Sequence, residues 1–253
     1  HRDLHSFPTR RSSDLGDENY HIYAVDLDGN NLKDLTPFDN IQAQFTELLK
    51  EDKDHIIVSM NKNNPQVFEP YKVNVVTGDM KQLFSNEDPS NPITGYDFDK
   101  DGNLKAYTKI RDGVEQDLYY EDGNGGYKLV KSLNWKDAFA VLNFNYASEN
   151  PNDAYMISNL DNDKAEVVLY DLKEDKIIKK VFSNDKYDVQ NMGISRKRGY
   201  ELDYFQFEGE KTEIVPVSDF YKKFHDKIVS LFPGKQYSIA DFPDEEDQFL
   251  IYI

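Results

Sequence analysis

Three carboxylates at alternate positions are the first residues whose spacing could do chemistry. Asp97, Asp99 and Asp101, followed by Gly102, match the first half of a calcium-binding loop, D-x-D-x-D-G. The bidentate acid that such a loop places eleven residues after its first Asp would fall on Thr108, and the residues that follow predict a strand rather than a helix. Because an Asp-Gly hairpin turn forms without a metal, we predict a turn here.

Gly193–Ser195 is the segment most similar to a serine-nucleophile motif, because it resembles part of the G-x-S-x-G elbow of serine hydrolases. The second glycine is missing, and the surrounding sequence predicts a strand and a turn instead of a strand-to-helix elbow. His21, His55 and His225 show no triad or metal-ligand spacing, and the chain contains no cysteine.

Other catalytic signatures are also missing from the sequence. It contains no Walker loop, no dinucleotide fingerprint and no H-E-x-x-H motif. The acidic run Glu245–Asp247 and the segment Asp161–Asp163 predict solvated turns. We therefore predict no catalytic, cofactor-binding or metal-binding residue in this chain, and no cofactor.

The strongest pattern is a hairpin that recurs along the chain. Its first copy, Asn19–Thr36, reads as strand, Asp-Gly turn and strand, and Asp28-Gly29 predicts a two-residue turn. Counted from Tyr23, the later copies at Tyr71, Tyr119 and Tyr170 follow at steps of 48, 48 and 51 residues. A repeat of this length is typical of propeller blades.

The strands around each hairpin predict blades of four strands. In the first group, Ile41–Leu48 and His55–Asn61 precede the Tyr71 hairpin, and three further groups begin near residues 93, 140 and 189. The fold class we predict is all-β, a β-propeller fragment of about four whole blades plus two half blades. A β-sandwich or β-helix fits less well, because a sandwich lacks a sustained repeat and β-helix coils are shorter.

One helix is predicted near residues 219–232. Phe220, Phe224, Ile228 and Leu231 fall on one helical face, Ser218 or Asp219 can cap the start, and Pro233-Gly234 ends the helix. We expect it to pack on the sheets as a surface insertion.

Residues 1–15 differ from the rest of the sequence. Arg2, Arg10 and Arg11 lie here, and no further arginine occurs before Arg111. The segment resembles the in-frame translation of a common sequencing adapter, so we expect it to be disordered and the propeller domain to span 16–253. The last residues stop inside an apolar run, which predicts a fragment at both ends. A closed ring would pair His21–Val25 with Phe249–Ile253, whereas an open arc would leave both edges unpaired.

Composition narrows the class of partner. The formal charge is −17, which disfavours nucleic acid or an anionic membrane surface. An aromatic content of 13% is enough for a packed β core. No apolar run is long enough to span a bilayer.

The hairpin Ile22–Thr36, the loop Asn61–Pro65, the turn Ser158–Asp163 and the helix end at Ser230–Gly234 together resemble the N-terminal propeller of the prolyl oligopeptidase family of serine peptidases. In that family the propeller covers a C-terminal α/β-hydrolase domain that carries Ser, Asp and His. The resemblance implies a propeller that admits short peptides to a hydrolase domain absent from this sequence, and a fragment that is inactive alone. Peptides are then the expected partners, and a periplasmic or extracytoplasmic compartment is slightly favoured.

A stand-alone TolB-like propeller that binds partner proteins is the alternative, because propellers of that type share the Asp-Gly hairpins. A propeller enzyme with its own active site has no supporting residue cluster.

Overall fold

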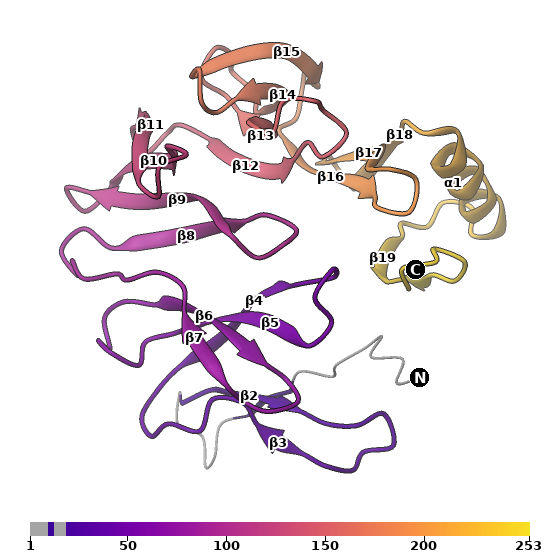
Figure 1. Cartoon of the computed structure of the whole chain (residues 1–253). Coiled ribbons are helices and arrows are strands. Elements are labelled where there is room, and N and C mark those ends of the chain that lie inside the picture. Colours follow the sequence, from indigo (N-terminus) through magenta and orange to yellow (C-terminus); the bar gives the residue numbers. More distant parts are fainter. Residues whose placement is uncertain (1–9, 13–18) are drawn as a thin grey trace. The chain divides into compact units, whose positions relative to one another are not determined.

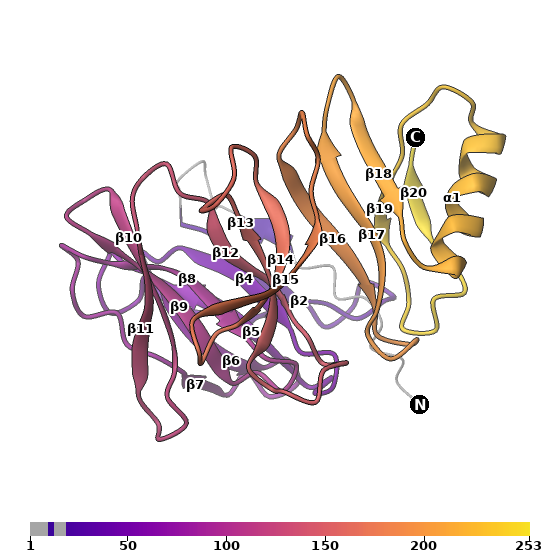
Figure 2. The same ribbon diagram turned by 90° about the horizontal axis from the view of Figure 1, so that it is seen from above.

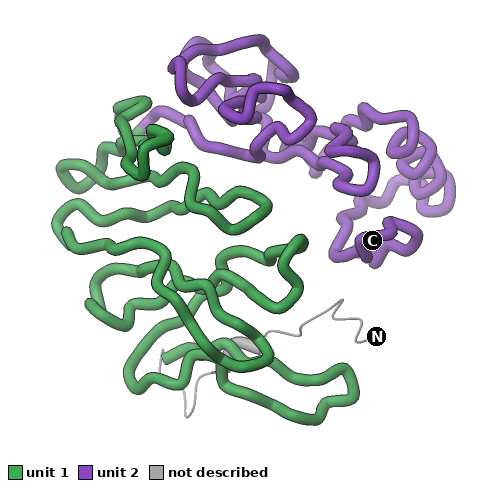
Figure 3. The backbone as a smooth tube through the Cα atoms, viewed as in Figure 1, with its two compact units in different colours: residues 1–135 green, residues 136–253 purple. Residues whose placement is uncertain are grey.

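The computed structural model describes residues 10–12 and 19–253, and the side chains of 19–253. The chain divides into two compact units, residues 1–135 and 136–253 (Figure 3). Each unit is a succession of small antiparallel sheets formed by consecutive strands.

Unit 1 contains three sheets (Figure 1). The first holds β1 (Arg10–Ser12), β2 (His21–Ala24) and β3 (Lys33–Asp34). The second holds β4 (Ala43–Leu48), β5 (His55–Met60), β6 (Glu69–Asn74) and β7 (Met80–Gln82). The third holds β8 (Ile93–Phe98), β9 (Leu104–Arg111), β10 (Glu115–Glu121) and β11 (Tyr127–Leu133).

Unit 2 also contains three sheets, together with one helix. The first holds β12 (Phe139–Phe144), β13 (Asp153–Ser158), β14 (Glu166–Asp171) and β15 (Lys176–Phe182). The second holds β16 (Val189–Ser195), β17 (Glu201–Glu208) and β18 (Thr212–Pro216). Helix α1 (Asp219–Leu231) leads to the pair β19 (Ser238–Asp241) and β20 (Leu250–Tyr252).

This architecture confirms the predicted fold class, all-β with the small antiparallel sheets of a propeller and one helix. The repeat is confirmed as well, because Tyr71, Tyr119 and Tyr170 all lie in the third strand of a four-stranded sheet. The fourth predicted group has the three strands that the sequence indicated, β16–β18, and the predicted helix α1 follows them.

The predicted two-residue turn at Asp28-Gly29 is wrong by one residue. The Gly29 N–H donates to the Asp26 carbonyl at 2.8 Å and the Asp26 N–H donates to the Asn30 carbonyl at 2.9 Å, which leaves a three-residue loop. Gly29 occupies the left-handed region with φ +82°. A type I turn followed by a glycine at positive φ is the usual geometry of such loops.

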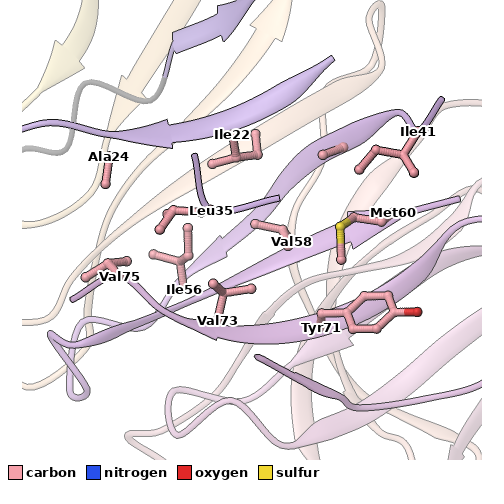
Figure 4. Packing of buried hydrophobic residues seen from close by; sticks show 11 residues of the cluster. Ile22, Ala24, Leu35, Ile41, Ile56, Val58, Met60, Tyr71, Val73 and Val75 are labelled. Atoms are coloured by element: carbon pink, nitrogen blue, oxygen red, sulfur yellow. The ribbon is translucent and has the colours of Figure 1, made fainter. Parts of the chain in front are cut away.

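The core of unit 1 joins its first two sheets. Ile22 on β2, Val58 on β5 and Val73 on β6 are at most 3% exposed and belong to one apolar cluster. Figure 4 shows these side chains directed toward one another between the strands. Alternation along each strand produces this arrangement, because successive side chains point to opposite faces of a sheet.

Helix α1 begins where the sequence predicted. Ser218 is the N-cap, and its side chain accepts a hydrogen bond from the Tyr221 N–H at 3.0 Å. The predicted apolar face is only partly right, because the buried residues of the helix are Tyr221 and Ile228 whereas Leu231 is 59% exposed. In two views the helix runs beside β18 and the β19–β20 pair (Figures 1 and 2).

In the described residues, the strands near each end of the chain pair within their own unit. β2 pairs with β1 on one side and with β3 on the other, and β20 pairs with β19. The edge of β2 that an open arc would leave unpaired is therefore occupied by Arg10–Ser12. Of residues 1–15, which we expected to be disordered, the structure describes only these three, and the others lie outside the described residues.

Candidate functional site

Two carboxylates on the first strands of neighbouring sheets form the candidate site of unit 1. Glu47 lies on β4 and Asp97 on β8, and the sheets that contain these strands share a core through Ile57 and Phe98. Both strands are irregular at these residues, with register shifts between Phe45 and Glu47 and directly after Asp97. Such bulges bend a strand and redirect a side chain, and they are frequent beside functional sites.

The Asp97 carboxyl has an unusual environment. Burial among neighbouring atoms, together with the negative charge of Glu47, raises the pKa of Asp97 to about 7. No cation pairs with Asp97 in the part of the chain that the structure describes. Glu47 is exposed, yet the surrounding protein still displaces enough water to raise its pKa, which the Leu48 backbone N–H and Lys50 oppose. The pair is therefore acidic, and no positively charged side chain of the described residues pairs with Asp97.

The residues of the calcium-like motif lie in two different environments: Asp97 belongs to the acidic pair, whereas Asp99 and Asp101 lie in a turn. The Asp99 carboxylate accepts hydrogen bonds from the backbone N–H groups of Asp101, at 3.0 Å, and Asn103, at 2.8 Å. Asp101 instead pairs with Lys100 at 2.9 Å. Gly102 is required, because it has φ +82° and a Cβ there would lie 2.9 Å from Leu49. Asp97, Asp99 and Asp101 therefore do not converge as ligands, and the predicted hairpin turn is confirmed.

A second group of carboxylates, in unit 2, surrounds Arg198. Its guanidinium donates to Asp203 at 2.6 and 2.7 Å, to Glu201 at 2.9 Å, and to Glu246. It also lies 4.0 Å from the ring centroid of Phe220, at the start of α1. Burial raises the pKa of Asp203, and the hydrogen bonds from Ser218 and Arg198 oppose that rise. Asp203 and Glu246 are buried and hydrogen-bonded within the protein, whereas Glu201 is exposed.

Glu246 corrects the prediction of a solvated turn at Glu245–Asp247. Its side chain is 8% exposed, and both carboxylate oxygens lie within 2.8 Å of the Ser195 hydroxyl. Ser195 thus binds a carboxylate and accepts from the Arg198 N–H at 3.1 Å. The Glu246 N–H donates to the Pro243 carbonyl in a turn, where Glu246 adopts φ 48°. Pro243 is the only sequence signal for this turn.

The partial elbow at Gly193–Ser195 is a packing feature. A Cβ at Gly193 would lie 2.0 Å from the ring of Tyr204, so the glycine makes room for an aromatic side chain. Ser195 has no histidine among its hydrogen-bond partners. This arrangement lacks the base that activates a serine nucleophile.

The loop Asn61–Pro65 is anchored to β6 through a third buried carboxylate. Glu69 is 3% exposed and accepts from the Asn63 side chain at 2.6 Å and from the Asn86 backbone N–H at 3.0 Å. Tyr71 lies beside it, and burial together with the Glu69 charge raises the pKa of Tyr71 to about 12. Only neutral groups donate to Glu69 among the hydrogen bonds of this cluster.

Each of the three described histidines has a hydrogen-bond partner within its own unit. His21 bonds to Asp34 at 2.7 Å, His55 to Asp52 at 2.8 Å and His225 to the Tyr237 hydroxyl at 2.8 Å. Among the described residues, no group of three or more His, Asp or Glu side chains could hold a metal ion. In the same residues, no helix combines the length and apolar character needed to cross a membrane.

Similarity to known proteins links this fold to peptidases. No protein-family model matches the chain. Over 126 residues, half of the chain, it is 33% identical to dipeptidyl aminopeptidase BIII of Pseudoxanthomonas mexicana, of which the match covers 18%.

Among solved structures, a study of two prolyl endopeptidases contains a chain that matches 80% of this one with a TM-score of 0.52 and 14% identity. The match covers 32% of that chain. Dipeptidyl peptidase 4 of Porphyromonas gingivalis matches 81% of this chain with a TM-score of 0.46 and 14% identity, over 36% of its own length. The chain thus spans only about a third or less of the length of these proteins. It is a β-propeller that is similar in fold to part of a prolyl endopeptidase and, over half of its length, similar in sequence to part of dipeptidyl aminopeptidase BIII.

Proposed function

We propose that the chain is the propeller portion of a serine peptidase that hydrolyses short peptides, and that it restricts access to a catalytic domain. The observation that carries this proposal is the 33% identity to dipeptidyl aminopeptidase BIII over 126 residues. The physical reasoning is steric: blades surround a central channel, and a channel narrower than a folded domain admits only short or extended peptides to a water-shielded chamber.

The acidic pair of unit 1 supplies a second element of this proposal. Glu47 and Asp97 lie on the first strands of their sheets, and we propose that these strands face the channel. The amino group of a peptide is a cation at neutral pH. An ammonium group beside Asp97 would favour its ionised form, because an opposite charge lowers the pKa of a carboxyl. We therefore propose that this pair selects peptides with a free amino terminus.

A TolB-like protein-binding module remains the competing function, because the Asp-Gly hairpins are common to both classes. The two are separated by the coding sequence that follows residue 253 in the source genome. A G-x-S-x-G elbow followed by Asp and His supports the peptidase. A stop codon within about one blade length favours the binding module.

The selectivity proposal is tested on the full-length protein of that locus. Cleavage is compared for a peptide and for its N-acetylated form, in the wild type and in the charge-reversal variants Glu47→Lys and Asp97→Lys. We expect both variants to reduce the preference for the free amino terminus. Asp185→Lys, at an exposed acid outside β4 and β8, is the matched control. An unchanged preference in both variants contradicts a role for the pair and leaves the peptidase assignment standing.

A further inference from the structure

We propose that Asn124 is a site of spontaneous deamidation, in which its side-chain amide becomes a carboxylate after attack by the Gly125 backbone nitrogen. Asn124 and Gly125 form the only Asn-Gly pair in the sequence. They lie in the loop that joins β10 to β11, and both residues are exposed. This inference does not depend on the proposed function.

The reaction consumes water and releases ammonia. The Gly125 nitrogen loses its proton and bonds to the side-chain carbonyl carbon of Asn124, the bond from that carbon to the amide nitrogen breaks, and ammonia leaves with a proton. The product of this step is a succinimide ring. Water then opens the ring at either carbonyl, which leaves aspartate or isoaspartate. A glycine favours the attack because it has no Cβ that could crowd the reacting atoms.

The geometry of the loop leaves the reacting atoms accessible. In the described residues, neither the Asn124 side-chain amide nor the Gly125 N–H has a hydrogen-bond partner. Gly125 adopts φ +86°, and a Cβ built there would meet no atom within 4 Å. The Asp122 carboxylate accepts from the backbone N–H groups of Asn124, at 2.7 Å, and Gly126, at 3.0 Å. The turn is therefore held by backbone groups, and the Asn124 side chain is left out of it.

Two other turns have the same Asp-Gly-Asn sequence but hold their asparagine side chain. The Asn30 amide donates to the Asp28 carboxylate at 2.9 Å, and the Asn103 amide donates to the Asp99 carboxylate at 3.0 Å. Neither asparagine precedes a glycine. The turn at Asn124 thus differs from both in the free side chain and in the residue that would attack it.

The Asp-Gly pair in the same loop is protected from the equivalent reaction. Hydrogen bonds from the backbone N–H groups of Asn124 and Gly126 lower the pKa of Asp122, so this carboxyl is ionised at neutral pH. A carboxylate resists attack by a nucleophile because it already carries a negative charge, whereas a neutral amide does not. Asn124, and not Asp122, is therefore the reactive side chain of this loop.

The product changes the end of the β10–β11 hairpin. Isoaspartate lengthens the backbone by one carbon within a loop that closes through the Asp122 N–H and the Gly126 carbonyl at 2.9 Å. It also places a new negative charge near Asp122. The strands pair as far as Glu121 and Tyr127, and the Tyr127 ring lies 5.1 Å from that of Tyr107. We expect amide hydrogen exchange at this end of the hairpin to become faster in the modified protein.

Incubation of the full chain at mildly alkaline pH, followed by peptide mapping with mass spectrometry, tests the proposal. We expect the NH₂ group of the Asn124 amide to be replaced by OH and both products to form, with isoaspartate detected by a methyltransferase that labels isoaspartyl carboxylates. Asn124→Gln should abolish the modification, since glutamine would have to close a larger ring. The matched control Asn30→Gln should leave it unchanged. A synthetic peptide of residues 121–127, treated in parallel, shows that the conditions permit the reaction.

A further variant separates the loop geometry from the Asn-Gly sequence. Asn31 has φ 54°, which suits glycine, so Asn31→Gly creates a second Asn-Gly pair in a turn that holds its asparagine side chain. We expect Asn30 in this variant to react more slowly than Asn124, and equal rates would contradict the role of the free side chain. An Asn124 that stays unmodified while the peptide reacts overturns the proposal. So does aspartate formed without isoaspartate, because water would then attack the amide directly.

Discussion

The two acidic groups of this propeller contrast in how their charge is compensated. In unit 2, Asp203 and Glu246 are each 8% exposed and both contact the Arg198 guanidinium. In unit 1, Asp97 lies beside Glu47 with no cation paired to it in the described chain, and its pKa rises to about 7. The first group stabilises the fold by joining the end of β16, the start of α1 and the loop before β20.

This difference indicates which group has the capacity to bind a ligand. A buried ion pair with complete hydrogen bonding has no free bonding capacity, and disrupting it is costly. A carboxyl whose ionised form is disfavoured gains most from an incoming cation. Perturbed carboxyls of this kind concentrate at functional sites. We therefore assign structural importance to the Arg198 group, and we propose that Glu47 and Asp97 bind the amino terminus of a peptide.

The largest expected effect comes from Arg198→Ala. This change leaves Asp203 and Glu246 buried without their cation, and we expect a loss of about 3–5 kcal/mol in the free energy of unfolding. Thermal and urea denaturation measure it. Lys222→Ala is the control, since Lys222 forms an exposed pair with Asp219 at 3.4 Å and should change stability by less than about 1 kcal/mol. Equal effects of both substitutions would contradict the structural role of Arg198.

Ser218→Ala should have the next largest effect. The Ser218 hydroxyl caps α1 at the Tyr221 N–H and also donates to Asp203 at 2.5 Å. Loss of the cap and of this donor should destabilise the protein by about 1–2 kcal/mol. Ser218→Thr retains a hydroxyl and should recover most of the loss in the same denaturation experiment. If threonine is as destabilising as alanine, the hydroxyl is not responsible.

Asp97→Asn should increase the stability of the protein, unlike the two preceding substitutions. The folded pKa of Asp97, about 7, exceeds that of an unfolded aspartate, so the folded protein holds the additional proton between about pH 4 and pH 7. Stability contributed by Asp97 is therefore fully present below this window and is lost as the pH rises through it. Above pH 7 we expect Asp97→Asn to stabilise the protein by about 1 kcal/mol, a value reduced for solvent screening.

Denaturation of the wild type and of Asp97→Asn across this pH range isolates the contribution, because the other carboxyls are common to both. The two stability curves should converge near pH 4 and separate toward pH 7. A constant difference between the curves would contradict the elevated pKa.

Glu47→Gln is expected to have the smallest effect. It removes the negative charge that assists burial in raising the pKa of Asp97. Since burial is the larger cause, the pKa should fall by less than about one unit and remain above that of an ordinary aspartate. NMR titration of Asp97 in this variant measures the shift. A return to the ordinary value would mean that Glu47, and not burial, dominates.

The fold was predictable from the sequence because the repeated strands carry local information. Alternating apolar residues and Asp-Gly turns recur with each tyrosine hairpin, and Ser218 at the start of an amphipathic segment predicts the capped helix. The loop at Leu27–Gly29 is one residue longer than predicted, since an Asp-Gly pair is compatible with more than one hairpin turn.

The acidic groups were much less predictable. Ser195 and Glu246 are separated by 51 residues in sequence, and no local pattern announces their hydrogen bond. Asp97 was singled out only as part of a calcium-like motif, and the significance of Glu47 depends on the packing of two sheets. The β1 strand was unexpected, because Arg10–Ser12 belongs to a segment that we expected to be disordered.

Titration of Asp97 in the presence of a peptide tests whether this carboxyl binds the amino terminus of the peptide. We would follow the side-chain carboxyl carbon by NMR from pH 4 to pH 9, in the free protein, with a short peptide and with its N-acetylated form. We predict a pKa of about 7 for Asp97 in the free protein, a decrease of this pKa with the free amino terminus and no change with the acetylated peptide. An ordinary pKa in the free protein, or identical responses to the two peptides, would contradict it.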